Sequence, residues 1–145
     1  FSLIQGFWNY FFASVRVNIL IIGVDNAGKT TLLERIKTQF GASHGLPPNK
    51  IPPTIGMNLA KIKYKGNQVV IWDLGGQTKM RKVWESYYTE ANAVVFIVDS
   101  ADTSRLQDVK NAFGEACAND ILAHTPVLFI ANKQDLPHAR SPAEL

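Results

Sequence analysis

The sequence predicts an α/β fold in which a mixed sheet is flanked by helices, a three-layer α/β/α arrangement. Three observations lead to this prediction. Short β-branched apolar runs alternate along the 145-residue chain with segments of helical periodicity. Residues 15–22 form the first run, and a glycine-rich turn separates it from residues 30–40, where apolar side chains recur at helical spacing. A strand, a glycine turn and a helix in this order direct backbone N–H groups toward an anion.

The later elements are predicted from the same two periodicities. Residues 55–64 and 69–72 are expected to form a β-hairpin joined across residues 65–68. A helix is predicted around residues 80–88. The remaining prediction is a strand, a helix and a strand over residues 93–98, 106–119 and 127–131. Before the hairpin, residues 41–53 contain two glycines and four prolines, the composition of a mobile loop.

The turn after the first strand contains residues 23–30 (GVDNAGKT), which have the spacing G-x-x-x-x-G-K-[ST] of a phosphate-binding loop. Lys29 is predicted to neutralise the outer phosphates, and the hydroxyl of Thr30 to ligate Mg²⁺. We expect Gly28 to let the main chain approach the phosphates, because a Cβ there would obstruct them. The predicted phosphate contacts of this segment are Asp25, Asn26, Ala27, Gly28, Lys29, Thr30 and Thr31.

Two further polar segments are predicted to sense the terminal phosphate. At the end of the hairpin, residues 73–77 (DLGGQ) place a carboxylate, Asp73, where it can hold Mg²⁺ through a water molecule. Gly76 is expected to offer its N–H to the phosphate, and Gln77 to orient the attacking water. Thr54 is predicted to be a second Mg²⁺ hydroxyl ligand, present only when the phosphate holds the preceding loop closed.

The last motif, residues 132–135 (NKQD), follows the final apolar strand at the end where open α/β sheets bind ligands. Asp135 offers a carboxylate acceptor, which favours guanine because adenine lacks the N1–H and N2 donors. The stem of Lys133 is expected to lie over the base, while Asn132 braces the turn against the phosphate loop. These residues predict a guanine-nucleotide site.

Composition and charge are those of an ordinary globular protein, with 46% hydrophobic residues, a net charge of +3 and an isoelectric point near 9.1. The Lys and Arg residues are interpreted as scattered, without the basic and aromatic cluster that would predict a nucleic-acid partner. Cys117 is the only cysteine, which excludes an internal disulfide and agrees with a reducing cytosol.

Both ends of the chain carry expectations of their own. Residues 1–14 are predicted to form an amphipathic helix, either packed on the core or lying in a membrane interface, and residues 15–145 a single domain. The sequence ends ten residues after Asp135, so we expect this domain to be incomplete, truncated before its last strand and helix. The strand at residues 127–131 would then be an open edge, and a chain extended by a strand and a helix should have a higher thermal midpoint.

Taken together, these motifs resemble those of small GTPases of the ADP-ribosylation factor (Arf) family. The resemblance covers essentially all 145 residues. The paired glycines before Gln77 distinguish this family from Ras-type relatives, and Val24 suggests the Arf-related and Arf-like branches. The segments that carry the resemblance are residues 23–31, 53–58, 72–77, 98–100 and 132–137.

The resemblance implies a Ras-like fold of the P-loop NTPase class that binds GTP or GDP with Mg²⁺ and hydrolyses GTP slowly, with Gln77 and Lys29 as catalytic residues. It also implies regulation of vesicle trafficking on the cytosolic face of Golgi and other secretory-pathway membranes. The implied partners are an exchange factor, an activating protein that supplies an arginine, and an effector at Met57, Trp72 and Tyr87. In the GTP state, a two-residue shift of the hairpin would release the N-terminal helix toward the membrane.

Two other functional classes remain open from the sequence. One is a different P-loop enzyme, such as an ATPase or a nucleotide kinase, and Asp135 argues against it. The other is a GTP-binding interaction module that scarcely hydrolyses its nucleotide. Gln77 argues against that module without excluding it.

Overall fold

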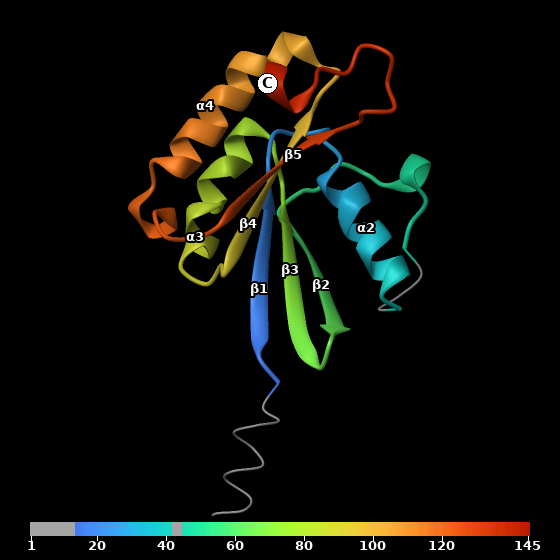
Figure 1. The fold of residues 1–145 in the computed structure, drawn as a ribbon, viewed down its shortest axis with the longest axis vertical. Helices are drawn as coiled ribbons and strands as arrows, with labels where there is room; N and C mark the ends of the chain where they lie inside the picture. The colour runs from blue at the N-terminus through green and yellow to red at the C-terminus, as the bar shows by residue number, and fades with distance from the viewer. Residues whose placement is uncertain (1–13, 42–44) are drawn as a thin grey trace, which may run out of the picture.

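The computed structural model describes residues 14–41 and 45–145 and confirms the predicted three-layer α/β/α architecture. A five-stranded mixed sheet has the order β2-β3-β1-β4-β5; β2 runs antiparallel to β3, and all other neighbours are parallel. Helix α2 covers one face, and α3 and α4 cover the other (Figure 1). The strands are β1 (Arg16–Ile22), β2 (Met57–Tyr64), β3 (Asn67–Leu74), β4 (Ala93–Asp99) and β5 (Val127–Asn132). The helices are α2 (Lys29–Gln39), α3 (Glu85–Tyr88) and α4 (Leu106–Cys117).

The central strands are uninterrupted apolar runs because both of their faces are buried. In β1, Leu20 and Ile22 pack toward α3 and α4, whereas Ile19 and Ile21 pack toward α2. Strands β3 and β4 alternate in the same way, which gives one apolar cluster on each side of the sheet. The predicted helix over residues 1–14 lies almost wholly outside the described residues.

Parallel pairing is the feature that builds the site. Strands β1, β3, β4 and β5 all run in one direction, so their carboxyl ends meet at one edge of the sheet. The phosphate-loop segment follows β1, residues 75–77 follow β3, and the NKQD turn begins at the end of β5. Segments that are more than 40 residues apart in the chain are therefore brought together, as expected for ligand sites in open α/β sheets.

The hairpin turn is shorter than the sequence predicted. Strands β2 and β3 are joined by two residues, Lys65 and Gly66, rather than by residues 65–68, and β3 continues to Leu74. The two turn residues have φ values of 48° and 79°. Positive φ at both positions matches the right-handed twist of the flanking strands, which allows a two-residue turn.

The helix predicted around residues 80–88 is a 3₁₀ segment, Thr78–Val83, followed by the single α-helical turn of α3. Two side chains bond back to glycine carbonyls at the end of β3. Trp84 Nε1 donates to the carbonyl of Gly75, and Arg81 Nε donates to that of Gly76, both at 3.0 Å. These bonds hold the segment against the strand end, where a short 3₁₀ connection is common.

Strand β5 lies at one edge of the sheet, and Val127 and Leu128 are 40% and 59% exposed. Among the described helices, none combines the length and the apolar character needed to cross a bilayer.

Candidate active site

The carboxyl edge of the sheet contains a cavity of about 340 Å³ between the phosphate-loop segment, the proline-rich loop and the end of β3. Eight of the residues predicted for the phosphate and metal site line it: Asp25, Asn26, Gly28, Lys29, Thr30, Thr31, Thr54 and Gly76. Gln77 lines it as well. Asp73, Ala27 and the guanine motif do not line it, so the cavity corresponds to the phosphate end of the predicted site.

Glycines of the phosphate loop are required by neighbouring protein atoms. Gly23 has a φ of 141°, and a Cβ there would lie 2.2 Å from the carbonyl oxygen of Ile97. Gly28 has a φ of 97°, and its Cβ would lie 2.3 Å from Asn132 Nδ2. A Cβ on Gly28 would thus meet the NKQD turn, and its expected obstruction of the phosphates stays a prediction, since Gly28 also lines the cavity. Gly28 permits the left-handed backbone that begins α2 and the close approach of Asn132.

Lys29 is almost fully buried, at 5% exposure, and its Nζ donates a 2.7 Å hydrogen bond to the carbonyl of Val24. Burial lowers the pKa of this ammonium to about 8, against the opposing effect of the Asp73 and Asp25 carboxylates. Because Lys29 also lines the cavity, phosphate charge entering there would favour its protonated form.

Two hydroxyls that line the cavity lie against a buried carboxylate outside its lining. Thr30 Oγ1 lies 2.6 Å from Thr54 Oγ1 and donates to Asp73 Oδ2 at 2.5 Å. Asp73 is fully buried, and its Oδ1 has no hydrogen-bond partner among residues 14–41 and 45–145. A buried carboxylate oxygen without a partner is costly. Hard oxygen ligands of this kind suit Mg²⁺ and its bound waters, so the three residues fit the predicted ion.

The residues after Asp73 pack directly against the phosphate loop. A Cβ on Gly76 would lie 2.4 Å from the backbone nitrogen of Asp25 and the carbonyl oxygen of Gly23. Gly76 is thus held in main-chain contact with the loop, close to the place predicted for the terminal phosphate. Gln77 is exposed at the rim of the cavity, where its amide is accessible to solvent.

Asn132 joins the NKQD turn to the phosphate loop: its Nδ2 donates to the carbonyl of Ala27 at 2.8 Å, which confirms the predicted brace. Lys133 has a φ of 62°, and its Nζ forms a 2.6 Å ion pair with Asp99 at the end of β4. Asp135 is exposed. The turn therefore lies beside the phosphate loop with one carboxylate open to solvent, as a base-reading group requires.

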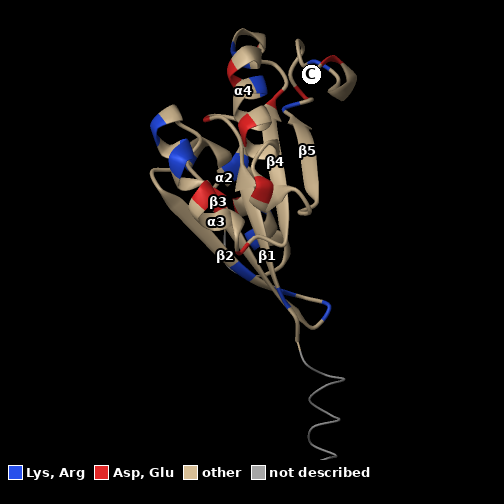
Figure 2. Cartoon of the chain, turned by 90° about the vertical axis from the view of Figure 1, so that its left-hand side faces the viewer, with Lys and Arg blue, Asp and Glu red and all other residues tan. Residues whose placement is uncertain are grey.

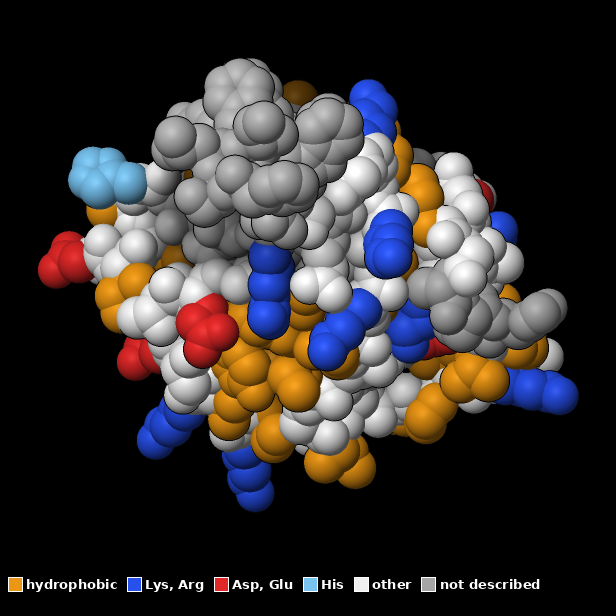
Figure 3. Space-filling view, turned by 90° about the horizontal axis from the view of Figure 1, so that it is seen from below, with side chains coloured by type: hydrophobic (Ala, Val, Ile, Leu, Met, Phe, Trp, Pro, Cys, Tyr) orange, Lys and Arg blue, Asp and Glu red, His pale blue; other side chains and the backbone are white. Residues whose placement is uncertain are grey.

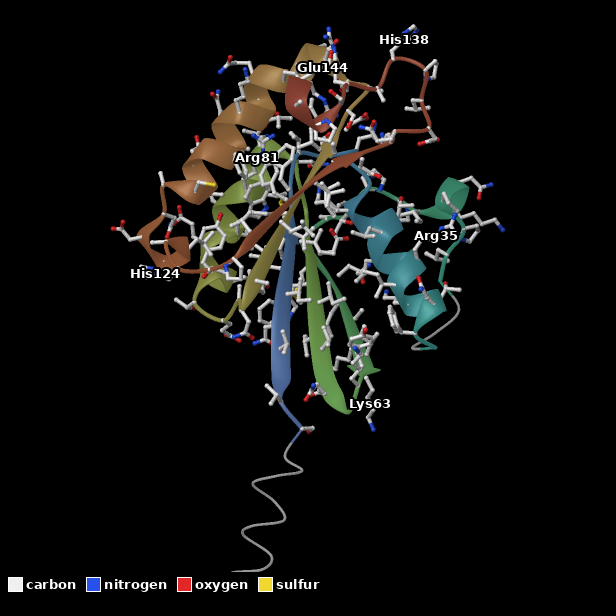
Figure 4. The ribbon with its side chains drawn as sticks, in the orientation of Figure 1. Arg35, Lys63, Arg81, His124, His138 and Glu144 are labelled. Atoms are coloured by element: carbon white, nitrogen blue, oxygen red, sulfur yellow. The ribbon has the colours of Figure 1, made fainter. Side chains whose placement is uncertain are left out.

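An arginine that the sequence analysis missed also contacts the phosphate loop. Arg105 Nη1 lies 3.1 Å from Asp25 Oδ1, and Nη2 donates to the Asp25 carbonyl at 2.9 Å. Its Nε donates to Asp102 at 2.7 Å, which fixes the guanidinium. The partners Arg105 and Asp25 are 80 residues apart, so no local pattern signals the contact. A second arginine, Arg81 (Figure 4), lies on the side of the sheet covered by α3 and α4 and pairs bidentately with Asp108 at 2.6 and 2.7 Å.

The three residues predicted to contact an effector differ in exposure. Met57 is 44% exposed, and Tyr87 is partly buried. Trp72 is only 6% exposed and packs edge-to-face against Tyr87, with ring centroids 5.4 Å apart. In this structure Trp72 supports the surface from below and is not itself open to a partner.

A Ras-like sheet with a phosphate loop, a hydroxyl–carboxylate cluster and an NKQD turn at one edge defines a P-loop GTPase. The sequence profile of the ADP-ribosylation factor family matches residues 4–145. The chain is 39% identical to human ADP-ribosylation factor-related protein 1, over 94% of this chain and 68% of that protein. It is 37% identical to ADP-ribosylation factor-like protein 5 of Caenorhabditis elegans, over 99% of this chain and 75% of the relative.

A solved structure supports the same assignment. This structure is that of the Arl6 BBS3 small GTPase from Trypanosoma brucei with bound nucleotide analogue GppNp. It superposes on this chain with a TM-score of 0.77 and 31% sequence identity, and the match covers 90% of this chain and 74% of that one. The chain belongs to the ADP-ribosylation factor family of small GTPases. It is accordingly a hydrolase acting on GTP and a nucleotide-dependent switch.

Proposed function

We propose that this GTPase regulates vesicle trafficking on the cytosolic face of Golgi and other secretory-pathway membranes, with the cavity at the sheet edge as its nucleotide and Mg²⁺ site. The observation that carries the nucleotide site is the convergence of Thr30, Thr54 and Asp73 beside the phosphate loop. The trafficking role is supported by the resemblance to the family and by membership of it.

Each predicted residue receives a role in this proposal. Backbone amides of the phosphate loop, including those of Asp25, Asn26, Ala27, Gly28 and Thr31, bind the phosphates, and Asp135 accepts hydrogen bonds from guanine. Thr30 and Thr54 hold Mg²⁺ directly, and Asp73 holds it through water. Asn132 fixes the base-reading turn to the loop through Ala27, and the stem of Lys133 covers the base.

Hydrolysis is proposed to proceed by attack of water on the γ-phosphate. The Gln77 amide orients the water, while Lys29 and the N–H of Gly76 stabilise the charge that develops on the phosphate. Mg²⁺ held by Thr30, Thr54 and Asp73 would supply positive charge that offsets the charge of the phosphates. Lys29 already lies in a dry environment, where its charge acts more strongly than it would in water.

An activating protein is proposed to supply the missing arginine. The two arginines nearest to the glycine-rich segments are occupied: Arg81 pairs with Asp108, and Arg105 pairs with Asp25 and Asp102. Hydrolysis by the chain alone should therefore be slow, and an arginine supplied in trans could raise its rate by about 10³–10⁵-fold. The proposal includes three further partners. These are an exchange factor, an effector at the Met57 and Tyr87 surface, and a membrane bound by residues 1–14 in the GTP state.

Nucleotide competition tests the site. A fluorescent GDP analogue should be displaced by GTP and GDP but not by ATP, and its release should accelerate when Mg²⁺ is chelated. Displacement by ATP at equal concentration would refute the guanine site and favour a different P-loop enzyme.

The variant Gln77→Leu tests the catalytic role. We expect it to lower single-turnover GTP hydrolysis about tenfold or more while leaving GDP affinity unchanged. Gln107→Leu, which changes a glutamine on the outer side of α4, is the control and should keep the wild-type rate. Equal hydrolysis rates in the two variants would show that Gln77 has no catalytic role.

A further inference from the structure

Charge is segregated along this chain. Residues 1–72 contain eight Lys or Arg and only two Asp or Glu, whereas residues 73–145 contain seven and ten. Between Glu34 and Asp73 there is no acidic residue at all. The interpretation of the basic residues as scattered was therefore wrong, because the first half carries a net charge of +6 and the second half −3. Such an asymmetry predicts an interaction with an anionic surface.

The fold gathers four of these charges at the end of the sheet opposite the nucleotide site. Lys63 pairs with Gln68, and Gln68 pairs with Arg16, so Lys63 and Arg16 lie in one row on the same face of the sheet. Lys61 lies two positions along β2 and therefore on the same face. Lys65 occupies the hairpin turn. We call Arg16, Lys61, Lys63 and Lys65 the basic end.

All four side chains of the basic end are exposed, and among the described residues no ion pair involves them. Figure 2 shows basic residues at the lower end of the hairpin, and Figure 4 shows Lys63 extending from it. One acidic residue approaches this face: Asn18 Nδ2 donates to the backbone carbonyl of Glu90 at 3.0 Å. The basic charges are therefore largely uncompensated.

Aromatic and apolar side chains lie around the hairpin turn. Tyr64 alternates with Lys63 along β2 and therefore lies on the α2 side of the sheet, on the other face from Lys61 and Lys63. Tyr64 and Phe40 are 46% and 40% exposed and pack edge-to-face with ring centroids 5.6 Å apart. Val15 is 59% exposed, and its amide donates to Asn67 Oδ1 beside the hairpin turn at 3.1 Å. Viewed from this end, the molecule shows Lys and Arg side chains next to an apolar patch (Figure 3). Tyrosine beside lysine is the composition that lipid headgroups favour.

We propose that the basic end is a docking surface for anionic lipid headgroups. This inference rests on the membrane part of the proposed function and deepens it, because it assigns lipid recognition to described residues outside the N-terminal segment. Val15 lies beside the hairpin turn, and the residues before it in the sequence include a segment rich in Phe, Leu and Trp at residues 1–12. An apolar insertion by that segment and a basic contact by the hairpin would then act on the same bilayer. A membrane is favoured over a nucleic acid because an exposed aliphatic side chain, Val15, lies beside the hairpin turn in addition to the aromatic rings.

The lysines on β2 also have a purely structural explanation. Strand β2 is an edge strand, and edge lysines discourage pairing between sheets of different molecules. This explanation predicts that their loss promotes self-association, without any effect on lipid binding. An experiment can therefore distinguish lipid binding from protection of the sheet edge.

The test is co-sedimentation of the full chain with vesicles of phosphatidylcholine, with and without phosphatidylserine, at low and high salt. Each lysine near an anionic surface contributes about a fivefold gain in binding, so Lys61→Gln/Lys63→Gln should bind phosphatidylserine vesicles about 25-fold more weakly than wild type. Lys110→Gln/Arg140→Gln removes the same charge from exposed positions in α4 and after β5 and is the control. Lys61→Arg/Lys63→Arg keeps both charges and should bind phosphatidylserine vesicles as tightly as wild type.

The inference is supported if the hairpin variant, Lys61→Gln/Lys63→Gln, loses vesicle binding and the control variant does not. The loss should be smaller at high salt, and Lys61→Arg/Lys63→Arg should bind vesicles as wild type does. Equal losses in the hairpin and control variants would overturn it, because net charge alone would then explain binding. Tighter binding to duplex DNA through the same lysines would also overturn it, in favour of a nucleic acid. Deletion of residues 1–13 distinguishes a failure of this inference from a failure of the proposed membrane function. If the deletion abolishes vesicle binding but the lysine variants do not alter it, the proposed membrane function stands and the inference about the basic end is refuted. Nucleotide competition, measured on the same variants, tests the GTPase site independently.

Discussion

Replacing Gly28 by alanine tests the contact between the phosphate loop and the NKQD turn. The added Cβ would lie 2.3 Å from Asn132 Nδ2, which donates the 2.8 Å bond to the carbonyl of Ala27. Alanine would also have to adopt a φ of 97°. Both effects act on the fold and on the site at once, since Gly28 begins α2 and Asn132 begins the base-reading turn.

The expected cost can be divided into two parts. A non-glycine residue in the left-handed region costs about 1–2 kcal/mol. Displacing Asn132 removes one hydrogen bond, a further loss of about 1 kcal/mol. Gly28→Ala should therefore lower the free energy of unfolding by about 2–3 kcal/mol and weaken GDP binding, because the two parts of the nucleotide site no longer meet. Urea unfolding and displacement of a fluorescent GDP analogue measure the two effects.

Gly66→Ala is the matched control, because Gly66 has a φ of 79° and nothing lies within 4 Å of its Cβ position. It should lose only the backbone part, about 1–2 kcal/mol, with GDP affinity unchanged. Adding Asn132→Ala to Gly28→Ala removes the colliding group, so the two changes should cost less together than the sum of their separate costs. Equal costs for Gly28→Ala and Gly66→Ala, or strict additivity with Asn132→Ala, would refute the reasoning.

Two more predictions follow from buried or bridging charges. Arg105→Gln frees the Asp25 carboxylate beside the phosphates, so GDP release measured by fluorescence should be about threefold to tenfold faster at low salt, with a smaller effect at high salt. Arg140→Gln, an exposed change, should leave the release rate unaltered. Glu34 is 7% exposed, and this burial by itself raises the pKa of its carboxyl. The hydrogen bonds from Lys37 and from the Leu46 amide outweigh the effect of burial, so the pKa of Glu34 is lowered overall. Glu34→Ala should cost about 1–3 kcal/mol in urea unfolding at neutral pH. Because a lowered carboxyl pKa stabilises the fold above its ordinary value of 4.5, wild type should lose more stability than Glu34→Gln as the pH falls below that value. Parallel pH curves would contradict the assigned role of Glu34.

Local patterns in the sequence were sufficient for most of the fold. The phosphate-loop spacing and the apolar runs of β1, β4 and β5 predicted strand, turn and helix, because each depends on periodicity or on a glycine within a few residues. The length of the hairpin turn and the 3₁₀ character of residues 78–83 were missed. Both depend on groups outside the local window: the cross-strand register of β2 and β3, and the bonds from Arg81 and Trp84 to Gly75 and Gly76.

The sequence by itself determined the proposed chemistry of the site, because the residue types proposed to bind phosphate, Mg²⁺ and guanine are adjacent in short motifs. Only the tertiary structure decided how those motifs support one another. Parallel pairing of β1 with β3 and β4 brings the phosphate loop against Gly76, Asn132 and Arg105, from segments 50 to 105 residues away. It also places Lys63 and Arg16 in one row at the opposite end of the sheet. Contacts between residues so distant in sequence are set by strand order and register, and no local pattern encodes either of them.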